Sequence, residues 1–429
     1  MGCEQINVGI LGYGVVGGGA YRILGDNAEA IAQRSGCPVT VTRVADLDWE
    51  REREVMPPES AQTADAADVV NDPNVDIVVE TIGGVSPARE YVLEAIGNGK
   101  AVVTANKELM AKHGAEILDA AAAARVDVEF EGSAGGGIPI IRSLKESLEG
   151  NAVREIAGIL NGTTNYILTR MTEGGESFDE ALSRAQELGY AEADPWADVE
   201  GDDAAYKIAI LAAIAFGKRI NIADVPREGI SKITPADIQY ASEMGYVIKL
   251  LAIARDEAGE IEVRVHPALV ATSHPLGAVS DVFNAVLVRG DAVGDVMLYG
   301  RGAGALPTGS AIVGDIISIA RNIRHGSMGR VACACQGHAT MRPMGDVQTR
   351  KYVRMAVRDE PGVMGKVATI FGEESVSINS VIQRRSEGDV AEIVWETHLV
   401  SESAFRTALR RISDLDVVVA TSSVIRVQE

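Results

Sequence analysis

Cysteine is scarce in this sequence, which bears on both disulfide bonds and thiol chemistry. The 429 residues include four cysteines, Cys3, Cys37, Cys333 and Cys335, with none between residues 38 and 332. Thiols this few and this far apart build no disulfide framework, as is usual in a reducing cytoplasm. Cys333 and Cys335 form a C-x-C pair without further ligands at zinc spacing. We therefore interpret them as strand or loop residues and predict no zinc site.

Basic residues and long apolar runs are also in short supply. Forty Lys and Arg face 61 Asp and Glu, a formal net charge of -21 that repels phosphate backbones and anionic membrane surfaces. Nucleic acid is therefore not an expected partner. The longest charge-free apolar run, residues 208–217, has ten residues, about half of what crosses a bilayer. The N-terminus lacks the basic start of a signal peptide, so we predict a cytoplasmic protein without a membrane partner.

Glycines follow the first predicted strand at the spacing of a dinucleotide-binding turn. The strand, residues 6–11, leads into GYGVVG and then into helical sequence to about Leu24. This order lets backbone amides and a helix N-terminus meet a pyrophosphate. Further strands are predicted at 39–45, 75–79 and 101–104, so the fold class is α/β, with a parallel doubly wound sheet of the Rossmann type. The cofactor-binding residues predicted in the turn are Gly12, Tyr13, Gly14, Val15, Val16 and Gly17.

The end of the second strand bears on which dinucleotide is bound. A carboxylate there accepts the ribose hydroxyls of NAD, whereas an arginine accommodates the 2′-phosphate of NADP. Asp46 and Asp48 favour NAD, yet Arg51 and Arg53 follow within reach of a phosphate. The sequence therefore predicts NAD(P) as cofactor and leaves the preference between the two forms open.

The pattern changes after the glycine cluster SAGGGIPI. The chain is long enough for two or three domains, and we predict that the first, residues 1–136, gives way to an α+β catalytic and dimerisation domain, residues 137–300. In this second domain we expect an open sheet that could pair across a subunit interface, in a homodimer or a homotetramer. Its predicted helices are 138–148 and 166–172, and its predicted strands are 153–160, 261–265 and 278–288.

The last part of the chain forms a third predicted domain. Residues 301–322, a glycine turn followed by an apolar helix, are expected to return to the first domain, and residues 323–350 to form a linker. Residues 351–429 then follow the order βαββαβ of a small ferredoxin-like regulatory module. Its Asp-Glu-Pro-Gly turn, residues 359–362, precedes a helix and is placed to hold an amino-acid ligand. A purely structural cap is the alternative.

A lysine after a run of carboxylates is the strongest catalytic candidate. In the segment GYAEADPWADVEGDDAAYK, Lys207 begins a helix with Ala, Ile and Leu on every face, as in a helix enclosed by protein. Burial lowers the pKa of a lysine and a nearby carboxylate raises it, so Asp203, one turn earlier, could set the proton affinity of the amine. Acid/base catalysis fits this pairing. An ordinary i,i+4 ion pair is the alternative.

Two further segments carry candidate sites. Lys107, in VVTANKELM, falls in the first turn of a helix, where the peptide dipoles disfavour a cation by roughly 0.3–1 kcal/mol. A functional role would explain the placement, although a solvated lysine is the alternative. The turn EGSAGGGIPII joins the carboxylate of Glu131 to accessible backbone carbonyls, a combination that suits a hard cation. A packing turn is the competing interpretation there.

The motifs together carry a family resemblance that covers essentially the whole chain. GYGVVG, VVTANKELM, EGSAGGGIPI, ILNGTTNYIL, GYAEADPWADVEGDDAAYK and RGAGALPTGSA follow in the family's order. On these residues the chain resembles a monofunctional homoserine dehydrogenase with a C-terminal regulatory ACT domain. Such enzymes reduce aspartate 4-semialdehyde to homoserine with a nicotinamide cofactor, on the way to threonine, isoleucine and methionine. The resemblance also implies threonine as an effector.

The resemblance assigns roles position by position. It implies that Lys207 is the general acid and that Lys107, at the junction of cofactor and substrate, stabilises the developing oxyanion. It implies a sodium site formed by Glu131 and the carbonyls of Ala134, Gly136 and Ile138. Trp196 replaces a smaller expected residue, which affects the local shape of the cleft. The predicted substrate-binding residues are Glu192, Asp198, Asp203 and Thr163, and the predicted cofactor-binding residues outside the glycine turn are Asp46, Arg51, Thr104, Lys107, Gly189 and Gly304, with Gly162 lining the same cleft.

Of three competing functions, one is excluded by the sequence and two remain. A thiol-dependent aldehyde dehydrogenase needs an activated cysteine near the nicotinamide, and the span from 38 to 332 has none. The remaining rivals are an NAD(P)-linked reductase of another small aldehyde or keto acid, and an amino-acid sensor that keeps the dinucleotide fold without turnover. The presence of both Lys107 and Lys207 argues against the sensor.

Overall fold

The computed structural model describes residues 5–329, 335 and 337–428. Of the predictions made above, those for Cys3 and Cys333 lie outside the described residues. The chain divides into two compact units, one of residues 1–156, 205–224 and 284–339, and one of residues 157–204, 225–283 and 340–429. The domain boundaries drawn from the sequence stay predictions, because these units interleave segments along the chain.

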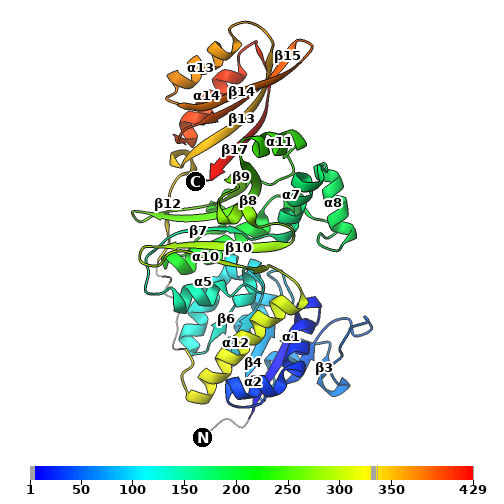
Figure 1. The fold of residues 1–429 in the computed structure, drawn as a ribbon. Coiled ribbons are helices and arrows are strands. Elements are labelled where there is room, and N and C mark those ends of the chain that lie inside the picture. The colour runs from blue at the N-terminus through cyan, green and yellow to red at the C-terminus, as the bar shows by residue number, and fades with distance from the viewer. Residues whose placement is uncertain (1–4, 330–334, 336, 429) are drawn as a thin grey trace. The chain divides into compact units, whose positions relative to one another are not determined.

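A parallel sheet organises the first unit (Figure 1). Its strand order is β3-β2-β1-β4-β5-β6, and β1 pairs in parallel with both β2 and β4. The predicted strands 6–11, 39–45 and 101–104 are confirmed residue for residue. The strands are β1 (Ile6–Leu11), β2 (Val39–Ala45), β3 (Gln62–Thr63), β4 (Ile77–Glu80), β5 (Ala101–Thr104) and β6 (Val128–Glu129), joined by α1 (Val15–Asp26), α2 (Ala28–Ser35), α3 (Ala67–Val70), α4 (Ala88–Gly97) and α5 (Lys107–Ala124).

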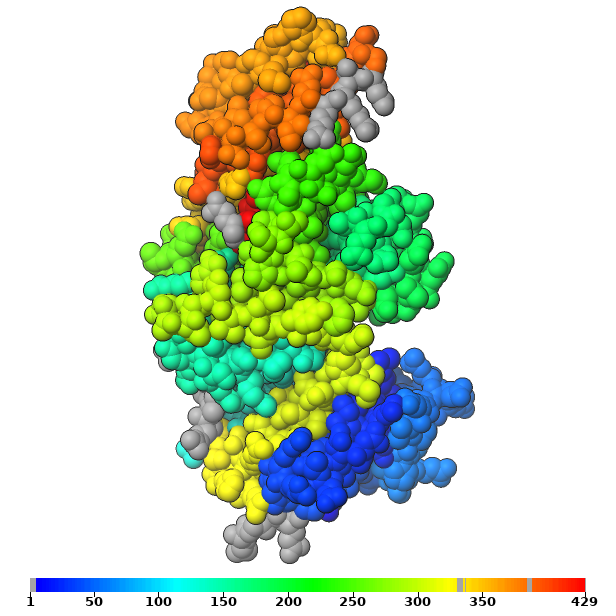
Figure 2. All heavy atoms as spheres, in the orientation of Figure 1, coloured from blue at the N-terminus to red at the C-terminus, as the bar shows by residue number. Residues whose placement is uncertain are grey.

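Helix α12 (Ala305–His325) returns to this sheet, as predicted from the sequence. Its residues Ile312, Ile316 and Ile319 are fully buried in the same core as the apolar side chains of β1. The backbones of α1 and α12 approach so closely that a Cβ on Gly19 would lie 2.1 Å from the carbonyl oxygen of Ala305. The blue surface of α1 and the yellow surface of α12 adjoin in Figure 2. Contact with α12 therefore fixes the helix that follows the glycine turn.

The segment after the glycine cluster differs from its prediction. Instead of one helix over 138–148, the structure has a short α6 (Ile140–Arg142) and a π-helical turn (Ser143–Ser147). The first-turn amides of Ile141 and Arg142 donate to the buried carboxylate of Glu131, at 2.8 and 2.7 Å. A long-range side chain thus sets the start of this helix.

The rest of the first unit includes an edge strand and part of a helix whose other part belongs to the second unit. β10 (Phe283–Gly290) neighbours β11 (Gly294–Arg301), which ends its sheet. The strand predicted from residue 278 begins only at Phe283, because Pro275–Ala278 forms a 3-10 turn and Asp281 has a positive φ of 59°. β7 (Val153–Ile159) and α10 (Asp202–Phe216) each contain a division point between the units.

The second unit combines a helical group with a long mixed sheet. Neighbouring strands run in the order β8-β9-β17-β13-β15-β14. Helix α7 begins at Gly162, four residues before the prediction, because the Asn161 side chain caps it. The elements are α7 (Gly162–Gly174), α8 (Phe178–Glu187), α9 (Trp196–Val199), α11 (Pro235–Glu243), β8 (Tyr246–Glu257), β9 (Glu260–Ala271) and β12 (Thr340–Met341).

The C-terminal module of the second unit has the predicted βαββαβ order. β13 pairs antiparallel with β15 and β17, and β14 pairs antiparallel with β15. Phe371 and Trp395 meet edge to face in its core, 5.6 Å between ring centroids. β13 begins within the predicted linker, and α12 ends within it. The elements are β13 (Gln348–Arg358), α13 (Val363–Glu373), β14 (Ile378–Glu387), β15 (Val390–Thr397), the short β16 (Val400–Ser401), α14 (Glu402–Ser413) and β17 (Val418–Gln428).

Candidate functional site

The glycine turn leaves room for a ligand at the start of α1. Gly12 has a φ of 88°, in the left-handed region that glycine adopts without strain. A Cβ on Gly17 would lie 2.2 Å from the carbonyl oxygen of Gly12, whereas a Cβ on Gly14 would meet nothing within 4 Å. Gly14 is the N-cap residue and makes no side-chain cap bond. The first-turn amides therefore face open space, and this turn fits the pyrophosphate of a dinucleotide.

The carboxylate after β2 is already engaged by protein groups. Asp46 accepts a hydrogen bond from the backbone N–H of Tyr13 at 2.6 Å and forms an ion pair with Arg53 at 2.9 Å. The Arg53 guanidinium also donates to the Tyr13 carbonyl and lies over the ring of Trp49, 5.2 Å from its centroid. Arg51 lines a neighbouring cavity of about 430 Å³ together with Gly14. Asp46 is thus paired with one arginine, while a second arginine, Arg51, lies beside the glycine turn.

Buried polar groups at the ends of β4 and β5 fix the start of α5. The Thr104 hydroxyl donates to the carboxylate of Glu80 at 2.5 Å, and Glu80 also accepts the amides of residues 82 and 83. Burial raises the pKa of Glu80, and these hydrogen bonds oppose the rise. Asn106 caps α5 by accepting the N–H of Leu109 at 3.0 Å. Lys107 is therefore held at the first position of α5, half-buried, as the sequence predicted.

Thr104 faces protein more than ligand in this arrangement. Its side chain is fully buried and also accepts the N–H of Asn106 at 3.0 Å. Its predicted contact with the cofactor stays a prediction. The sequence analysis missed Glu80, although a carboxylate at the end of an otherwise apolar strand is a usable signal.

The predicted cation turn contains a buried carboxylate that accepts hydrogen bonds from two backbone amides. Glu131 is 5% exposed, and its two oxygens accept the amides of Ile141 and Arg142. Burial raises the pKa of Glu131 above its ordinary value. Asp315 accepts the N–H of Glu131 at 2.9 Å, and burial raises its pKa as well. A cation would offset the cost of burying this negative charge, so the turn fits the predicted site. Within the described residues, no group of three or more His, Cys, Asp or Glu side chains is placed to hold a metal ion.

Lys207 lies in the first half of α10 and is 7% exposed. Ile208, Ala209 and Leu211 are each 2% exposed or less, whereas residues 213–216 are only partly buried, so the predicted enclosure holds for the first part of the helix. A lysine with its amine in bulk solvent would have excluded the proposed chemistry. Lys207 is buried, as this chemistry requires.

One amide in the second unit holds two of the predicted substrate carboxylates. Asn161 Nδ2 donates to Asp198 Oδ1 at 2.7 Å and to Asp203 Oδ2 at 2.9 Å. Its Oδ1 accepts the N–H of Thr164 at 2.8 Å, which fixes the side chain at the start of α7. Both amide hydrogens are used, so Asn161 has none left for Glu192, which is exposed. The structure therefore brings Asp198 and Asp203 together and leaves Glu192 outside this cluster.

The remaining predicted residues of this unit lie nearby in the chain. The Thr163 hydroxyl donates to the carbonyl of Tyr190 at 2.7 Å. Gly189, just before it, has a φ of 74°, and a Cβ there would meet nothing within 4 Å. Trp196 is 63% exposed, so its size does not fill the interior. In the first unit, Gly304 is the N-cap residue of α12, with a φ of 124°. The sequence analysis missed Asn161, although ILNGTTNYIL places it before a helix.

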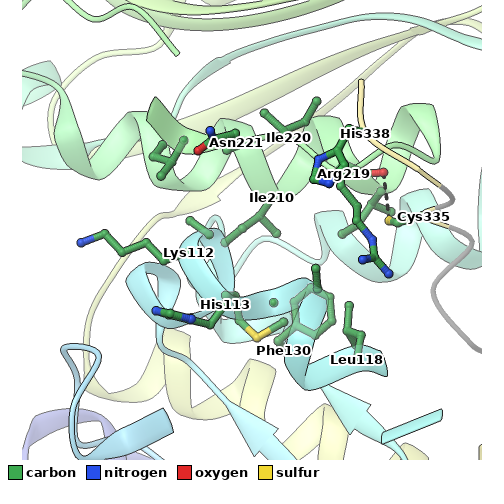
Figure 3. A pocket seen from close by; sticks show the side chains of 18 residues that line it. Lys112, His113, Leu118, Phe130, Ile210, Arg219, Ile220, Asn221, Cys335 and His338 are labelled. Carbon is green, nitrogen blue, oxygen red and sulfur yellow. Dashed lines mark hydrogen bonds between the residues drawn. The ribbon is translucent and has the colours of Figure 1, made fainter. Parts of the chain in front are cut away.

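A large apolar cavity of the first unit is lined by other residues. It has a volume of about 540 Å³ and is walled by α5 from Met110 and by α10 from Ala209. Figure 3 shows the side chains of Phe130 and Ile210 lining it and the Cys335 thiol bonded to the Ala213 carbonyl, at 3.2 Å. None of the predicted catalytic, substrate-binding or cofactor-binding residues lines it.

Comparison with known proteins decides the family. Residues 139–317 match the model of homoserine dehydrogenase, residues 12–131 that of its NAD-binding domain, and residues 351–417 that of the ACT domain. Homoserine dehydrogenase of Bacillus subtilis is 43% identical over 99% of both chains. That of Synechocystis is 47% identical over 98% of this chain and 99% of its own. The chain belongs to the homoserine dehydrogenase family.

Solved structures of family members agree. A homoserine dehydrogenase from Thiobacillus denitrificans is 44% identical, with a TM-score of 0.95, and the match covers 100% of this chain and 99% of that one. A hyperthermophilic archaeal homoserine dehydrogenase in complex with NADPH is 27% identical, with a TM-score of 0.62, over 73% of this chain and 97% of its own. These findings confirm the predicted fold class and family. The chain is therefore an NAD(P)-dependent oxidoreductase with a C-terminal ACT domain. In the described part of the chain, no helix has the length and apolarity of a bilayer span.

Proposed function

We propose that this chain interconverts aspartate 4-semialdehyde and homoserine by direct hydride transfer, with Lys207 as the general acid. The observation that carries the proposal is a lysine that is 7% exposed, one helical turn after Asp203 in α10. Desolvation lowers the pKa of an ammonium, which favours proton transfer to a substrate oxygen, and burial keeps water out of that transfer. The carboxylates of Asp203 and Asp198 can accept hydrogen bonds from a positively charged group, such as the ammonium of an amino-acid substrate.

Each chemical task has a candidate residue. The dinucleotide, when bound at the glycine turn, supplies or accepts the hydride. Lys207 gives its proton to the carbonyl oxygen as that oxygen becomes an alkoxide, and it accepts the proton in the reverse direction. Lys107, at the first position of α5, places a second cation where negative charge develops. Asp198 and Asp203, held by Asn161, bind the substrate ammonium.

We propose that NADP is preferred over NAD. The Asp46 carboxylate, which would accept the ribose hydroxyls of NAD, is already paired with Arg53 and bonded to the Tyr13 amide. Arg51 lines the cavity beside the glycine turn and is available for a 2′-phosphate.

We propose that a monovalent cation, with sodium the first candidate, binds at the Glu131 turn. Its ligands would be the Glu131 carboxylate and the carbonyls of Ala134, Gly136 and Ile138. The support is a buried carboxylate with a raised pKa that accepts hydrogen bonds from two neutral amides. A bound cation orders this turn and the start of α6.

The C-terminal module supports a regulatory proposal. Residues 357–364, Gln383 and Ile393 line a cavity of about 360 Å³ at the start of α13, a size suited to an amino acid. We propose threonine as its ligand and feedback inhibition as its effect.

The edge of the sheet supports an oligomer. β11 ends its sheet and exposes Met297 and Tyr299, at 39% and 54%. An unpaired edge with apolar side chains favours pairing with a second copy, so we propose a homodimer or homotetramer. We also propose a cytoplasmic location, as in the sequence analysis.

One assay tests the proposed reaction against its rivals. Cofactor absorbance is followed with homoserine and each oxidised dinucleotide, with and without sodium. Turnover with homoserine supports the proposal, and a higher kcat/KM with NADP supports the preference. Turnover of other hydroxy acids but not homoserine would favour a different reductase. No turnover under any condition, with threonine still bound, would favour the sensor.

A further inference from the structure

A short segment of the second unit, residues 225–234, touches the acidic substrate segment at one end and the ACT sheet at the other. We call residues 225–234 the strap and residues 198–203 the acidic segment. The strap leads into α11, which begins at Pro235. No role was predicted for the strap from the sequence, yet it contacts the acidic segment at one end and the ACT sheet at the other.

Side chains and backbone of the strap both contact the acidic segment. Arg227 forms an ion pair with Asp202, and the Ser231 hydroxyl donates to Glu200 at 2.5 Å. The N–H of Ile230 donates to the Val199 carbonyl at 2.8 Å. The two backbones are so close that a Cβ on Gly229 would lie 2.4 Å from the Val199 oxygen. A shift of the strap must therefore move the acidic segment.

The acidic segment carries the carboxylates that bind substrate in the proposed function. Asp198 and Asp203 flank the residues that the strap holds, and Asn161 fixes both from the other side. Arg227 reaches Asp202 directly before Asp203. It lies outside the substrate-binding pair and acts on it through the backbone. Arg227 is thus a positioning residue.

The other end of the strap is anchored in a buried ionic cluster of the ACT sheet. Thr234 caps α11 and shares a capping box with Asp237. Arg354 of β13 donates to Asp237 at 2.8 Å and to the Thr234 hydroxyl at 3.0 Å, and Glu392 of β15 accepts from the same guanidinium at 2.6 Å. The side chains of Asp237 and Arg354 are 0% and 9% exposed. The guanidinium of Arg354 is buried and presents its N–H groups in a fixed plane. These hydrogen bonds therefore hold Thr234 and Asp237 in a defined orientation.

The anchor strand leads straight to the proposed effector cavity. β13 continues from Arg354 to Arg358, and residues 357–364 line that cavity. The strap also pairs with β9, since the N–H of Glu228 donates to Val265 at 2.9 Å, and Arg426 of β17 forms an ion pair with Glu228 at 2.9 Å. Two ACT strands therefore contact the strap or its helix cap.

We propose that the strap positions the substrate carboxylates through Arg227 and transmits occupancy of the ACT cavity to them through Arg354. The proposal rests on the proposed function, because it takes Asp198 and Asp203 as substrate ligands and the ACT cavity as the effector site. Its physical content is a continuous set of contacts from β13 to Asp203, all within one compact unit.

The positioning claim is tested with the full chain. Arg227→Gln removes the ion pair and Arg227→Lys keeps the charge. Arg184→Gln is the matched control, because Arg184 forms a similarly half-exposed pair with Glu176. We expect Arg227→Gln to raise the KM for homoserine about tenfold, with the dinucleotide KM and the melting temperature unchanged. Arg227→Lys should recover most of the affinity. An unchanged homoserine KM, or equal losses in both KM values, would overturn the claim.

The transmission claim is tested by threonine. Calorimetry measures threonine binding, and a rate assay measures inhibition, for the parent and for Arg227→Gln. We expect equal binding but inhibition weakened about fivefold or more in the variant. Inhibition reduced only in proportion to binding would overturn transmission. If the parent does not bind threonine, the effector proposal fails, and the transmission claim fails with it, while the homoserine KM still decides the positioning claim.

Discussion

Four buried carboxylates, two in each unit, are stabilised in different ways. In the first unit, Glu80 and Glu131 accept hydrogen bonds from amides and a hydroxyl, and burial raises their pKa values. In the second unit, Asp237 and Glu402 are bonded to arginine or lysine. The pKa of Glu402 falls to about 2, because Arg426 and Lys351 outweigh the desolvation that opposes them.

This difference separates groups available for function from groups committed to structure. A carboxylate with neutral donors gains from an added cation or proton, whereas a carboxylate already paired with a guanidinium has little to gain. Lys207, the general acid of the proposed function, lies in the first unit. We therefore expect removal of the Lys207 charge to lower turnover and removal of the Glu402 charge to lower stability.

Lys351 sharpens the contrast. Although it pairs with Glu402, burial lowers its pKa to about 8, and repulsion by Arg426 adds to the effect. Both partners of the pair thus shift downward. Burial and the second cation dominate at the lysine, whereas the two cations together dominate at the carboxylate.

The largest effect is expected at Lys207. Lys207→Met should lower kcat by about 10²–10⁴, because a positioned general acid contributes that much, with dinucleotide binding retained. Lys100→Met is the matched control, since Lys100 is also buried in the first unit but donates to backbone carbonyls, with 2.8 Å to Val75. The control should lose stability and keep its kcat per folded enzyme. Equal losses of kcat in the two variants would erase the distinction. Steady-state rates and melting curves give both readouts.

The next effect is on stability in the second unit. Glu402→Gln breaks a buried pair and should cost about 3–5 kcal/mol of unfolding free energy near pH 7. Because the pKa of Glu402 is lower in the folded state, its stabilisation is complete above about pH 4.5 and is lost as pH falls toward 2. The gap between parent and variant should close over that range. Glu373→Gln, in an exposed pair with Arg411, is the control and should change stability by less than about 1 kcal/mol. A gap that stays constant down to pH 2 would contradict the assignment.

A smaller effect is expected at the cation turn. The raised pKa of Glu131 means that ionisation costs stability as pH rises above the unfolded value. Sodium should offset that cost and raise the melting temperature of the parent, with potassium or choline chloride as the ionic-strength control. Glu131→Gln should lose the sodium increment while its stability without sodium changes by only about 1 kcal/mol. A sodium increment that survives in the variant would place the cation elsewhere.

The smallest effect concerns cofactor choice. Arg53→Ala frees the Asp46 carboxylate, which can then accept ribose hydroxyls. The ratio of kcat/KM for NADP over NAD should fall about fivefold, a change of roughly 1 kcal/mol. Arg89→Ala, which breaks a pair with Glu116 outside the cofactor cavity, is the control in the same unit. A ratio that is the same in Arg53→Ala and the parent would remove Asp46 from cofactor selection.

The sequence predicted the elements whose signals are local. The strands at 6–11, 39–45 and 101–104, the buried helix of Lys207 and the βαββαβ order all follow from periodicity and turn residues. The first position of α5 for Lys107 was equally readable from its N-cap. The family motifs also predicted the reaction, whereas the roles assigned to individual site residues stay predictions.

The features that the sequence did not predict depend on contacts between distant residues. Asn161 meets Asp203 across 42 positions, and Arg354 meets Asp237 across 117. The start of α6 depends on Glu131, which accepts the amides of Ile141 and Arg142 that an ordinary helix start leaves open. Such contacts have no local periodicity, and only the folded chain displays them.

The central claim is that the amine of Lys207 supplies the proton. Chemical rescue tests it most directly: single-turnover hydride transfer is measured for Lys207→Ala with and without methylammonium, while dinucleotide binding is titrated in the same samples. The account predicts unchanged binding, a rate lowered by about 10² or more, and partial recovery that grows with methylammonium concentration. Hydride transfer at the parent rate in Lys207→Ala without added amine would contradict it.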